Sequence, residues 1–446
     1  MKFSSRNDIK IITGIMALTM LLEGCTQVAG HRNEEPTEEP TQISQIELKN
    51  DPEIKTEIDL DKVGDTDYDR ELMDEAYRNY CFNLFSQTIR DYGDDGNVMI
   101  SPASIMIALD MVSAGAKGDS LDQLTYLFAP GQGPLTQQAY AADLMDRINE
   151  AKKVDFTCAN AVWANGLRLS DKINMDYVDY IQEEFLAEYT MTDFDSSTPD
   201  EINAWIDENT NHMIEKAIDQ LYPDAVMVLV NAIAFEAEWM DPYTEDQISD
   251  GFFTAADGTT SEVSFLHDTV GFYFETDKAT GFMRYYEGGQ YAFVAILPTD
   301  ESVSANEFAM NFTAEDYEAF INSQTSQYEV VTKLPEFESD FDILMNDTIA
   351  GLGCDSIFQS STADFSGIAG VPGDIYVSRI IHKTHIEVDR AGTRAAAVTA
   401  IEMTEACCEE EPVIEYRYVL CDRPFAYAIV DVESMAPVFI GTVNEI

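Results

Sequence analysis

Histidines are the side chains best suited to catalytic or metal chemistry, because an imidazole can serve as acid, base or ligand near neutral pH. Only five occur in the 446 residues. His382 and His385 are the closely spaced pair, but the apolar alternation over residues 380–388 predicts a strand, in which residues three apart face opposite sides. We therefore predict that they share no metal ion.

Nucleophile and phosphate-binding motifs are absent from the sequence. There is no G-x-S-x-G elbow, no P-loop and no dinucleotide fingerprint. The 82 acidic residues are so abundant that a pair of carboxylates at any given spacing would arise by chance. We therefore expect that the protein is not an enzyme and that it binds no cofactor.

The seven cysteines include no C-x-x-C pair and do not cluster with histidines, so no zinc site is predicted. Their spacing indicates no disulfide framework either. Cys81 and Cys158 lie in apolar-patterned segments, where a free cysteine usually behaves as a small hydrophobe. We predict that both are buried in the core, and we predict no metal ligands in the chain.

Cys25 differs from the other cysteines because it follows a segment typical of export. Three basic residues precede an apolar stretch at 11–22, which is short for a membrane span and typical of a signal peptide. Residues 22–25 read Leu-Glu-Gly-Cys and resemble a bacterial lipobox. We predict that residues 1–24 are a lipoprotein signal peptide and that lipidated Cys25 anchors an extracytoplasmic, cell-surface protein. The alternative is an ordinary secretory signal followed by an unmodified cysteine.

Residues 25–74 are acidic and contain few large apolar side chains, which predicts a flexible tether. A calcium loop starting at Asp59 is excluded, because Val63 and Arg70 stand where an EF-hand needs oxygen ligands. The whole chain has 26 basic residues against 82 acidic ones, a net charge of −56. Such a charge repels polyanions, so we expect no nucleic-acid partner and no heparin.

Residues 75–446 predict one mixed domain, without an internal repeat or a flexible linker. Ser101 and Pro102 can start a helix, since serine caps and proline fits the first turn. Helical patterns come mainly first and strand patterns mainly later, which indicates an α+β fold with antiparallel or mixed sheets. Helical patterns occur at 76–85, 104–112 and 199–205, and buried-strand patterns at 225–235, 291–298 and 425–430.

Eight short segments, in the same order along the chain, resemble signatures of the serpin family. The resemblance implies the serpin fold, with three β-sheets, eight or nine helices and an exposed reactive loop near the C-terminus. It also implies that the loop acts as bait for a protease. The matching segments are 97–109, 229–239, 334–337, 363–368, 382–383, 392–400, 422–425 and 439–444.

The resemblance places a hinge at the start of the loop. The residues from the hinge onward show whether this segment could become a strand of a sheet. Because side chains alternate along a strand, one face would carry only small or apolar residues, from Thr393 to Met403. The other face would carry Arg394 and Glu402, and no proline interrupts the run. This sorting predicts that the loop can insert into a sheet. The hinge residues are Gly392, Thr393, Ala395, Ala396, Ala397 and Thr399.

The hinge departs from the family at two positions. Arg390 and Arg394 stand where serpins usually carry acidic residues. We expect both side chains to remain exposed, so that insertion is slowed or altered at most.

The resemblance also implies a buried polar cluster, the shutter, beneath the place where the central strands part. Hydroxyl, amide and imidazole groups there would satisfy one another, and the network could either exchange partners on insertion or stay static. Trp239 would mark the breach above it. The shutter residues are Ser101, Ser104, Asn231 and His382, and we assign His382 a structural role rather than a catalytic one.

The bond to be cut follows from counting along the loop. Fourteen positions from Gly392 place it between Ala406 and Cys407, whereas a count back from Pro424 leads to Val413. We favour the first count, because the loop length before the bait decides how far a trapped protease is carried.

The bait residues narrow the protease class. No lysine or arginine lies between Arg394 and Arg417, which disfavours trypsin-like enzymes. Ala406 suits an elastase-like serine protease, with a papain-like cysteine protease as the second choice. We therefore predict a monomeric suicide-substrate inhibitor that forms a covalent one-to-one complex. The alternative is a non-inhibitory serpin acting as a binding or carrier module.

Overall fold

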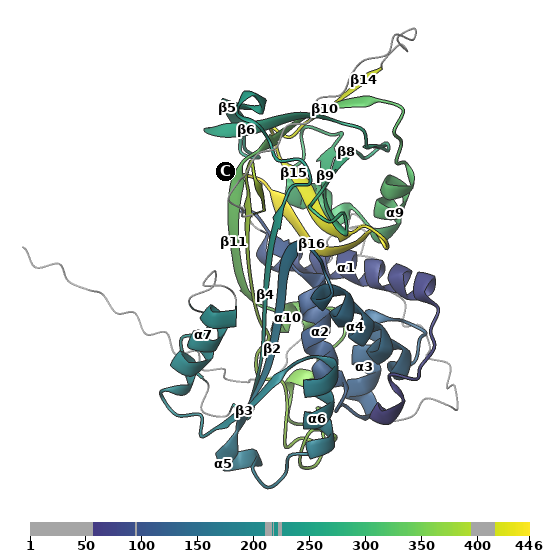
Figure 1. Ribbon diagram of the computed structural model, residues 1–446. Coiled ribbons are helices and arrows are strands. Elements are labelled where there is room, and N and C mark those ends of the chain that lie inside the picture. The colour runs from purple at the N-terminus through teal and green to yellow at the C-terminus, as the bar shows by residue number, and fades with distance from the viewer. Residues whose placement is uncertain (1–56, 94–95, 210–215, 217, 222–224, 394–414) are drawn as a thin grey trace, which may run out of the picture. The chain divides into compact units, whose positions relative to one another are not determined.

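The computed structural model describes residues 57–93, 96–209, 216, 218–221, 225–393 and 415–446, and the statements that follow refer to these residues. Residues 53–446 group into one unit by their internal contacts. Three β-sheets and ten α-helices make up this unit, with three short 3₁₀ helices (Figure 1).

The first sheet, here called the central sheet, contains six strands and provides the frame for the hinge. Its strands are antiparallel except β2 and β3, which run parallel. The β12–β13 and β13–β4 pairings join its two halves. In order across the sheet the strands are β11 (Phe337–Leu344), β12 (Ile381–Val388), β13 (Gly392–Thr393), β4 (Met227–Glu238), β2 (Val154–Asn165) and β3 (Glu188–Thr192).

The other two sheets are built mainly from the C-terminal half of the chain. The six-stranded one is antiparallel, and its strands β9, β15 and β16 are buried at every position. The continuous apolar runs predict this burial for β9 and β15. Its order is β1 (Met99–Ile100), β16 (Ala436–Val443), β15 (Phe425–Asp431), β9 (Tyr291–Pro298), β8 (Ala279–Tyr285) and β7 (Tyr273–Glu275). The four-stranded one has the order β14 (Tyr416–Leu420), β10 (Glu329–Pro335), β6 (Thr260–Val270) and β5 (Ile248–Thr254), with β14 parallel to β10.

Most helices precede the strands in the chain, as the α+β prediction requires. Ser101 caps α2 by accepting a hydrogen bond from the Ser104 N–H, and Pro102 occupies the first turn, both as expected. The α-helices are α1 (Arg70–Tyr92), α2 (Pro102–Ser113), α3 (Gly118–Phe128), α4 (Pro134–Asn149), α5 (Gly166–Leu169), α6 (Met175–Glu184), α7 (Thr198–Asn209), α8 (Ala305–Asn311), α9 (Ala314–Asn322) and α10 (Asn346–Gly351). The 3₁₀ helices are η1 (Leu60–Lys62), η2 (Glu245–Gln247) and η3 (Ser356–Phe358).

Two expectations need correction. Ten α-helices are present in the described part rather than the eight or nine that the resemblance implies, and two of the ten, α5 and α10, are short, with four and six residues. The tether is shorter than expected, because residues 57–74 belong to the folded unit. Val63 is 2% exposed, and Asp69 caps α1 by accepting a hydrogen bond from the Leu72 N–H.

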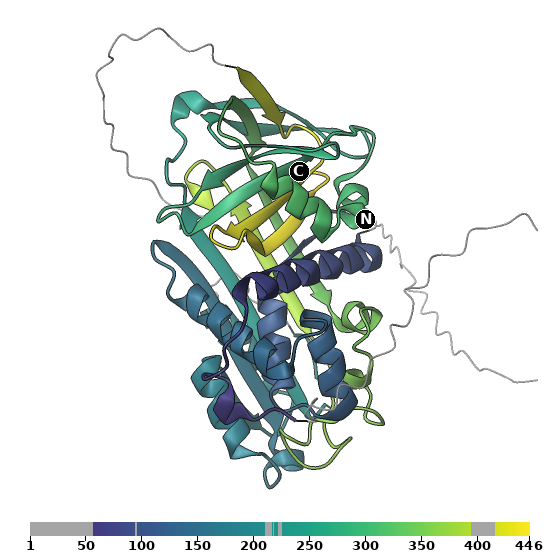
Figure 2. The ribbon, with the colours of Figure 1, turned by 90° about the vertical axis from the view of Figure 1, so that its right-hand side faces the viewer.

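Helices cover both faces of the central sheet. Helix α2 packs against one face and α7 against the other (Figure 1), and Figure 2 shows α1 lying across α2 and α3. A separate small core forms where Ile202 and Ile206 of α7 meet Trp163 and Val228 of the sheet. The sheet therefore lies between two apolar layers at its lower end.

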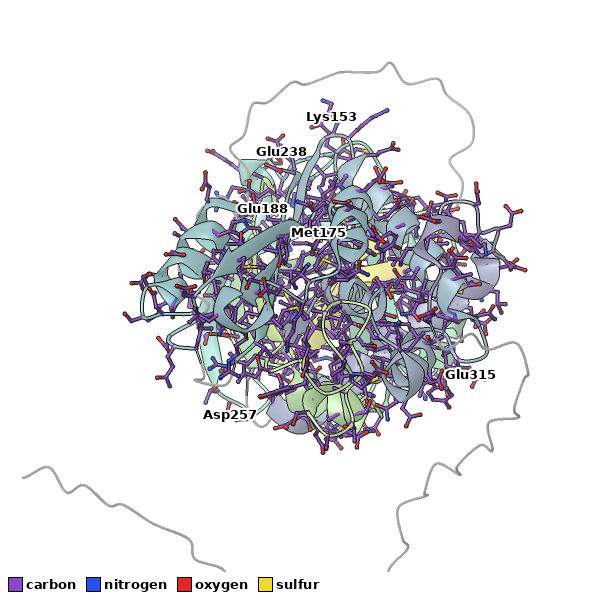
Figure 3. All side chains as sticks on the ribbon, turned by 90° about the horizontal axis from the view of Figure 1, so that it is seen from below. Lys153, Met175, Glu188, Glu238, Asp257 and Glu315 are labelled. Carbon is purple, nitrogen blue, oxygen red and sulfur yellow. The ribbon has the colours of Figure 1, made fainter. Side chains whose placement is uncertain are left out.

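Acidic side chains lie on many sides of the surface. Glu188, Asp257 and Glu315 are exposed, and Figure 3 labels them at separate places in the view. None of the described helices is both long and apolar enough to cross a bilayer.

Candidate functional site: the hinge and the shutter

The hinge begins with a tight turn between β12 and β13. The Asp389 Oδ1 atom accepts hydrogen bonds from the backbone N–H of Ala391 at 2.7 Å and of Gly392 at 3.0 Å. The Asp389 N–H in turn donates to the Gly392 carbonyl at 2.9 Å. Because an aspartate can satisfy backbone donors just ahead of it, these residues close the turn without a longer loop.

Gly392 lets β13 approach β4 closely. A Cβ atom at this position would lie 2.1 Å from the Ala237 carbonyl oxygen and 2.6 Å from the Glu238 Cα atom. Such contacts are sterically impossible, so no other residue fits without moving the strand. Thr393 follows and pairs with Val388 on β12 and Ala237 on β4. The first two residues of the hinge, Gly392 and Thr393, therefore already form a short strand of the central sheet.

Beyond β13, β12 and β4 face each other almost without backbone pairing in the described residues. In the described part of the chain, the pairing between β12 and β4 is limited to one parallel bridge, from Leu229 to Ile380. Residues 230–235 of β4 and 381–386 of β12 form no ladder with each other. We call this interval the open seam. Backbone groups normally find partners, so the seam is a place where a strand could be added.

Trp239 holds the turn from the end of β4. Its ring stacks on Tyr286, with the ring centroids 4.6 Å apart and the planes 7° from parallel. The indole N–H donates to the Asp389 carbonyl at 2.9 Å, and the backbone N–H of Trp239 donates to the Ala391 carbonyl at 2.9 Å. One residue thus makes two hydrogen bonds to the hinge turn.

Sequence reasoning missed Arg284, which supports this tryptophan. The Arg284 side chain is 7% exposed, and its guanidinium carbon lies 3.9 Å from the Tyr243 ring centre and 5.5 Å from that of Trp239. The guanidinium forms an ion pair with Asp268 and donates to the Asp241 carbonyl. A cation over aromatic faces is favourable when it is also paired in this way. The only local signal is a single arginine within the apolar segment 279–285.

Arg390, the first departure in the hinge, has a partner that the sequence did not reveal. Its Nε and Nη2 atoms lie 3.0 and 3.2 Å from the two carboxylate oxygens of Glu336, just before β11. The backbone N–H of Arg390 also donates to Glu336, at 3.2 Å. The Arg390 side chain remains 50% exposed, as predicted. The fork-shaped pair therefore ties the hinge turn to β11.

The four residues assigned to the shutter lie together under the open seam. The Ser101 hydroxyl donates to the Val438 carbonyl at 2.8 Å, and the Ser101 N–H donates to His382 Nε2 at 3.1 Å. The Ser104 hydroxyl donates to Asn231 Oδ1. The cluster thus connects α2 with β12 on one side and with β4 on the other.

Asn160 and Cys158 of β2 extend this network, and sequence reasoning did not include them. Asn231 Nδ2 donates to Asn160 Oδ1 at 2.7 Å and lies 3.6 Å from Cys158 Sγ. Asn160 Nδ2 donates to the Phe185 carbonyl at 3.1 Å. An asparagine in an apolar strand was a visible signal, but only the pairing of Asn160 with Asn231 identifies its partner.

His382 is neutral in this environment. Its side chain is buried, and burial lowers the pKa of the imidazole from 6.5 to about 3. A buried imidazole without a carboxylate partner stays unprotonated, so Nε2 can accept the Ser101 N–H. This is the structural role that the sequence predicted for it.

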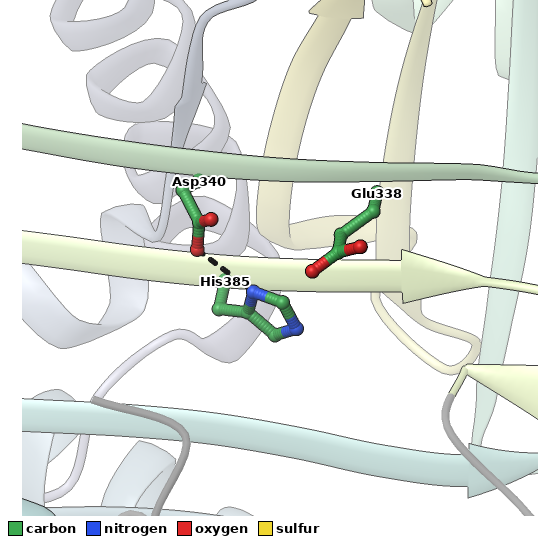
Figure 4. Close-up of side chains that lie close together, drawn as sticks. All are labelled: Glu338, Asp340 and His385. Carbon is green, nitrogen blue, oxygen red and sulfur yellow. Dashed lines mark hydrogen bonds and ion pairs between the residues drawn. The ribbon is translucent and has the colours of Figure 1, made fainter. Parts of the chain in front are cut away.

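His385 points to the opposite face of β12, as predicted from strand alternation. Its Nδ1 atom lies 2.8 Å from Asp340 on β11 (Figure 4). Possible ligand atoms of Glu338, Asp340 and His385 lie within 4.8 Å of one another, and both carboxylates are exposed. The paired imidazole and carboxylate link two adjacent strands on the solvent side, away from His382.

Cys81 and Cys158 are buried, as predicted, and burial raises the pKa of both thiols, that of Cys158 to about 11. Other predicted residues lie outside the described part of the chain: Cys25, Arg394, Ala395, Ala396, Ala397, Thr399, Ala406, Cys407 and the alternative Val413.

Comparison with known proteins identifies the architecture. A family model described as "Serpin (serine protease inhibitor)" matches residues 75–446. This chain belongs to the serpin family. Serpins are in general protease inhibitors rather than enzymes, and they generally form complexes with their target proteases.

Relatives from distant organisms match most of the chain. An uncharacterized serpin-like protein of Methanosarcina acetivorans is 26% identical over 98% of each chain. Leukocyte elastase inhibitor A of Mus musculus is 27% identical over 84% of this serpin and 99% of its own length. Among solved structures, the thermophilic serpin tengpin in its native state is 32% identical, with a TM-score of 0.77 over 85% of this chain and 96% of its own.

The low pKa of His382 predicts an acid-sensitive shutter. The unfolded histidine takes up a proton below pH 6.5 while the folded one does not until about pH 3, so folding stability is lost as the pH falls through this window. From pH 6.5 to pH 5, His382 should lower the free energy of unfolding by an amount on the order of 1–2 kcal/mol. Urea unfolding of wild type and His382→Gln at both pH values should show a smaller loss in the variant.

His385→Gln changes a histidine on the other face of the same strand and serves as the matched control. Equal losses in wild type and His382→Gln would contradict the assignment of a neutral, buried imidazole.

The pair between Arg390 and Glu336 predicts a charge-dependent hinge. Arg390→Glu would place two carboxylates together and should lower the melting temperature of the intact protein, as should Glu336→Arg through two cations. The exchanged double variant should recover most of the loss. A double-mutant cycle should give a coupling of about 1 kcal/mol, since the pair is partly exposed. Additive effects would show that the two side chains do not hold the hinge together.

Proposed function

We propose that this serpin is a suicide-substrate inhibitor of elastase-like serine proteases. In this proposal the protease cuts the loop after Ala406, and residues beyond Thr393 then enter the open seam as a new strand of the central sheet. The trapped acyl-enzyme would be carried along with the strand. The observation that carries the proposal is β13, a strand already started between β12 and β4.

The register of β13 supports insertion into the shutter. Thr393 faces Ala237 on β4 and Val388 on β12. If the strand lengthened in the same antiparallel register, Thr399 would arrive opposite Asn231 and His382. A hydroxyl would thereby reach the two shutter residues that border the seam. This match favours a network that exchanges partners over a static one.

The same register offers a role for the second departure in the hinge. Arg394 would lie between Glu236 of β4 and Glu387 of β12, on the solvent side of the sheet. Opposite charges directly across neighbouring strands are favourable, so Arg394 would assist insertion rather than slow it. The buried side would receive only small residues such as Ala395 and Ala397.

Insertion would release free energy that the intact protein stores. About a dozen new backbone hydrogen bonds, at roughly 1 kcal/mol net each, would contribute on the order of 10 kcal/mol. Burial of the small side chains would add to this. The intact form would therefore be held by a kinetic barrier rather than by the lowest free energy.

The protease class follows from the bait residues. Ala406 suits a shallow specificity pocket, and the absence of basic residues between Arg394 and Arg417 argues against trypsin-like enzymes. The name of the mouse relative, leukocyte elastase inhibitor A, is consistent with this class. The acidic residues around the bait would attract a basic protease.

We further propose that the mature protein is a cell-surface lipoprotein anchored through Cys25. The basic and apolar leader followed by Leu-Glu-Gly-Cys supports this location. The whole sequence has a net charge of −56, which supports the proposal that the protein binds neither nucleic acid nor heparin-like polyanions.

Thr393→Arg should convert the inhibitor into a substrate. The arginine would have to be buried on the inserted face, where an unpaired charge costs several kcal/mol. Insertion would slow, and the acyl-enzyme would have time to hydrolyse. Incubation with pancreatic elastase followed by a denaturing gel should show cleavage but little SDS-stable complex.

Ala396→Arg is the matched control, because alternation places residue 396 on the solvent face. It should still form the complex. Undiminished complex formation by Thr393→Arg would contradict the insertion mechanism.

The cut should fall between Ala406 and Cys407, and it should stabilise the protein. Mass spectrometry of the C-terminal fragment should find Cys407 within about two residues of the new N-terminus. The cut protein should melt at a much higher temperature, since the freed loop completes the sheet. A fragment starting at Ile414 would identify Val413 as the bait. An unchanged melting temperature would favour a non-inhibitory serpin.

Cys25→Ala should release the protein from membranes. The wild type should fractionate with membranes because lipid chains on Cys25 insert into the bilayer. The variant should appear in the soluble fraction, as detected by immunoblotting of cell fractions. A soluble wild type that retains residues from 26 onward would overturn the lipoprotein proposal.

A further inference from the structure

The strand that follows the reactive loop exposes an unusual apolar face. On β14, Tyr416, Tyr418 and Leu420 are 50%, 63% and 37% exposed, whereas Val419 between them is fully buried. Because side chains alternate along a strand, the three exposed residues share the solvent face. Large side chains exposed side by side usually mark a contact surface.

The neighbouring strands continue this face with few acidic residues. Tyr418 pairs with Val331 and Leu420 with Lys333 on β10, which pair in turn with Thr269 and His267 on β6. Lys333 is neutralised by Asp422 at 2.9 Å and lies 4.0 Å from the Phe265 ring centre. The acidic exception is Glu329, opposite Tyr416 at the start of β10. In a chain with 82 acidic residues, such a face is distinctive.

We infer that this tyrosine face, formed by Tyr416, Tyr418 and Leu420 with Val331, is a second docking surface for the target protease. The inference rests on the proposed function and adds to it a contact outside the cleaved segment. Tyrosines are enriched in protein interfaces, because each offers a large rigid contact area and a polar tip. The protease would need an apolar patch beside the part of its cleft that holds residues after the cut.

The chain itself indicates the occupant. Tyr416 lies ten residues after Ala406, so an extended chain can separate them by at most about 35 Å. A protease of about 240 residues has a radius of gyration near 18 Å and a diameter of roughly 45 Å. The diameter of a protease that holds the bait is therefore larger than the greatest distance that the chain allows between the bait and the tyrosine face. The argument also holds if Val413 is the bait, since Tyr416 is then three residues away.

Position in the fold favours the protease over a second copy of this chain. The face lies on β14, at the end of the fold away from α5 and α6, and residue 415 directly follows the loop segment (Figure 1). Two molecules with a net charge of −56 each would also repel one another. A basic protease would be attracted to the same region.

The test measures the second-order rate constant at which pancreatic elastase consumes the intact serpin, whether into complex or into cleaved product. The double variant Tyr416→Ser/Tyr418→Ser should lower this rate constant at least about fivefold. The share of molecules trapped as SDS-stable complex should stay unchanged, since insertion does not involve β14. Tyr418→Phe should keep most of the wild-type rate constant.

Tyr126→Ser on α3 is the matched control, because Tyr126 is 47% exposed and lies on another element. An unchanged rate constant in the double variant would overturn the docking surface, as would an equal loss in the Tyr126 variant. Sedimentation that shows wild type, but not the double variant, forming dimers would assign the face to a second copy instead. Failure of the proposed function gives a separate result: elastase cleaves wild type without forming a complex, while the rate constants still test the surface.

Discussion

The missing backbone pairing between β4 and β12 in the described residues is the constraint on which the rest of this structure depends. Both strands are long and fully embedded in the central sheet, yet in the described residues they join only at β13 and at the bridge from Leu229 to Ile380. A sheet normally satisfies its backbone groups by pairing every neighbour. In the proposed mechanism the open seam keeps free energy in reserve, and insertion of the residues after Thr393 would recover it.

The hinge turn is held by contacts of different kinds. Trp239 supplies two hydrogen bonds, Gly392 permits close approach to β4, and Arg390 pairs with Glu336 beside β11. Each contact ties the turn to a different strand, so the start of the loop is positioned before any protease arrives. Arg390 stands where the resemblance implies an acidic residue, and it forms an ion pair with Glu336 on the adjoining segment.

The shutter beneath the seam shows how a buried polar cluster remains satisfied without charge. His382 stays neutral and accepts a backbone N–H, while Ser104, Asn231 and Asn160 pass hydrogen bonds from α2 to β4 and β2. A charged group there would carry a large desolvation cost, and an apolar group would leave neighbours unsatisfied. A neutral network is therefore suited to the place where, in the proposed mechanism, a new strand would enter the sheet.

Local patterns in the sequence determined several of the elements. The continuous apolar runs predicted β9 and β15, alternation predicted that His382 and His385 face opposite ways, and Ser101 with Pro102 predicted the start of α2. These features depend on residues within one or two turns or a few strand positions, so their physical cause is present in the local sequence. The ordered motifs also identified the family and hence the three sheets.

Only the tertiary structure decided which distant residues meet. Arg390 and Glu336 are 54 positions apart, Asn231 and Asn160 are 71 apart, and Arg284 reaches Trp239 from another sheet. Strand register sets these contacts, and register depends on the packing of the whole sheet rather than on any local propensity. With 82 acidic residues in the chain, Glu336 could not be singled out as a partner until the folded strands placed it beside the hinge.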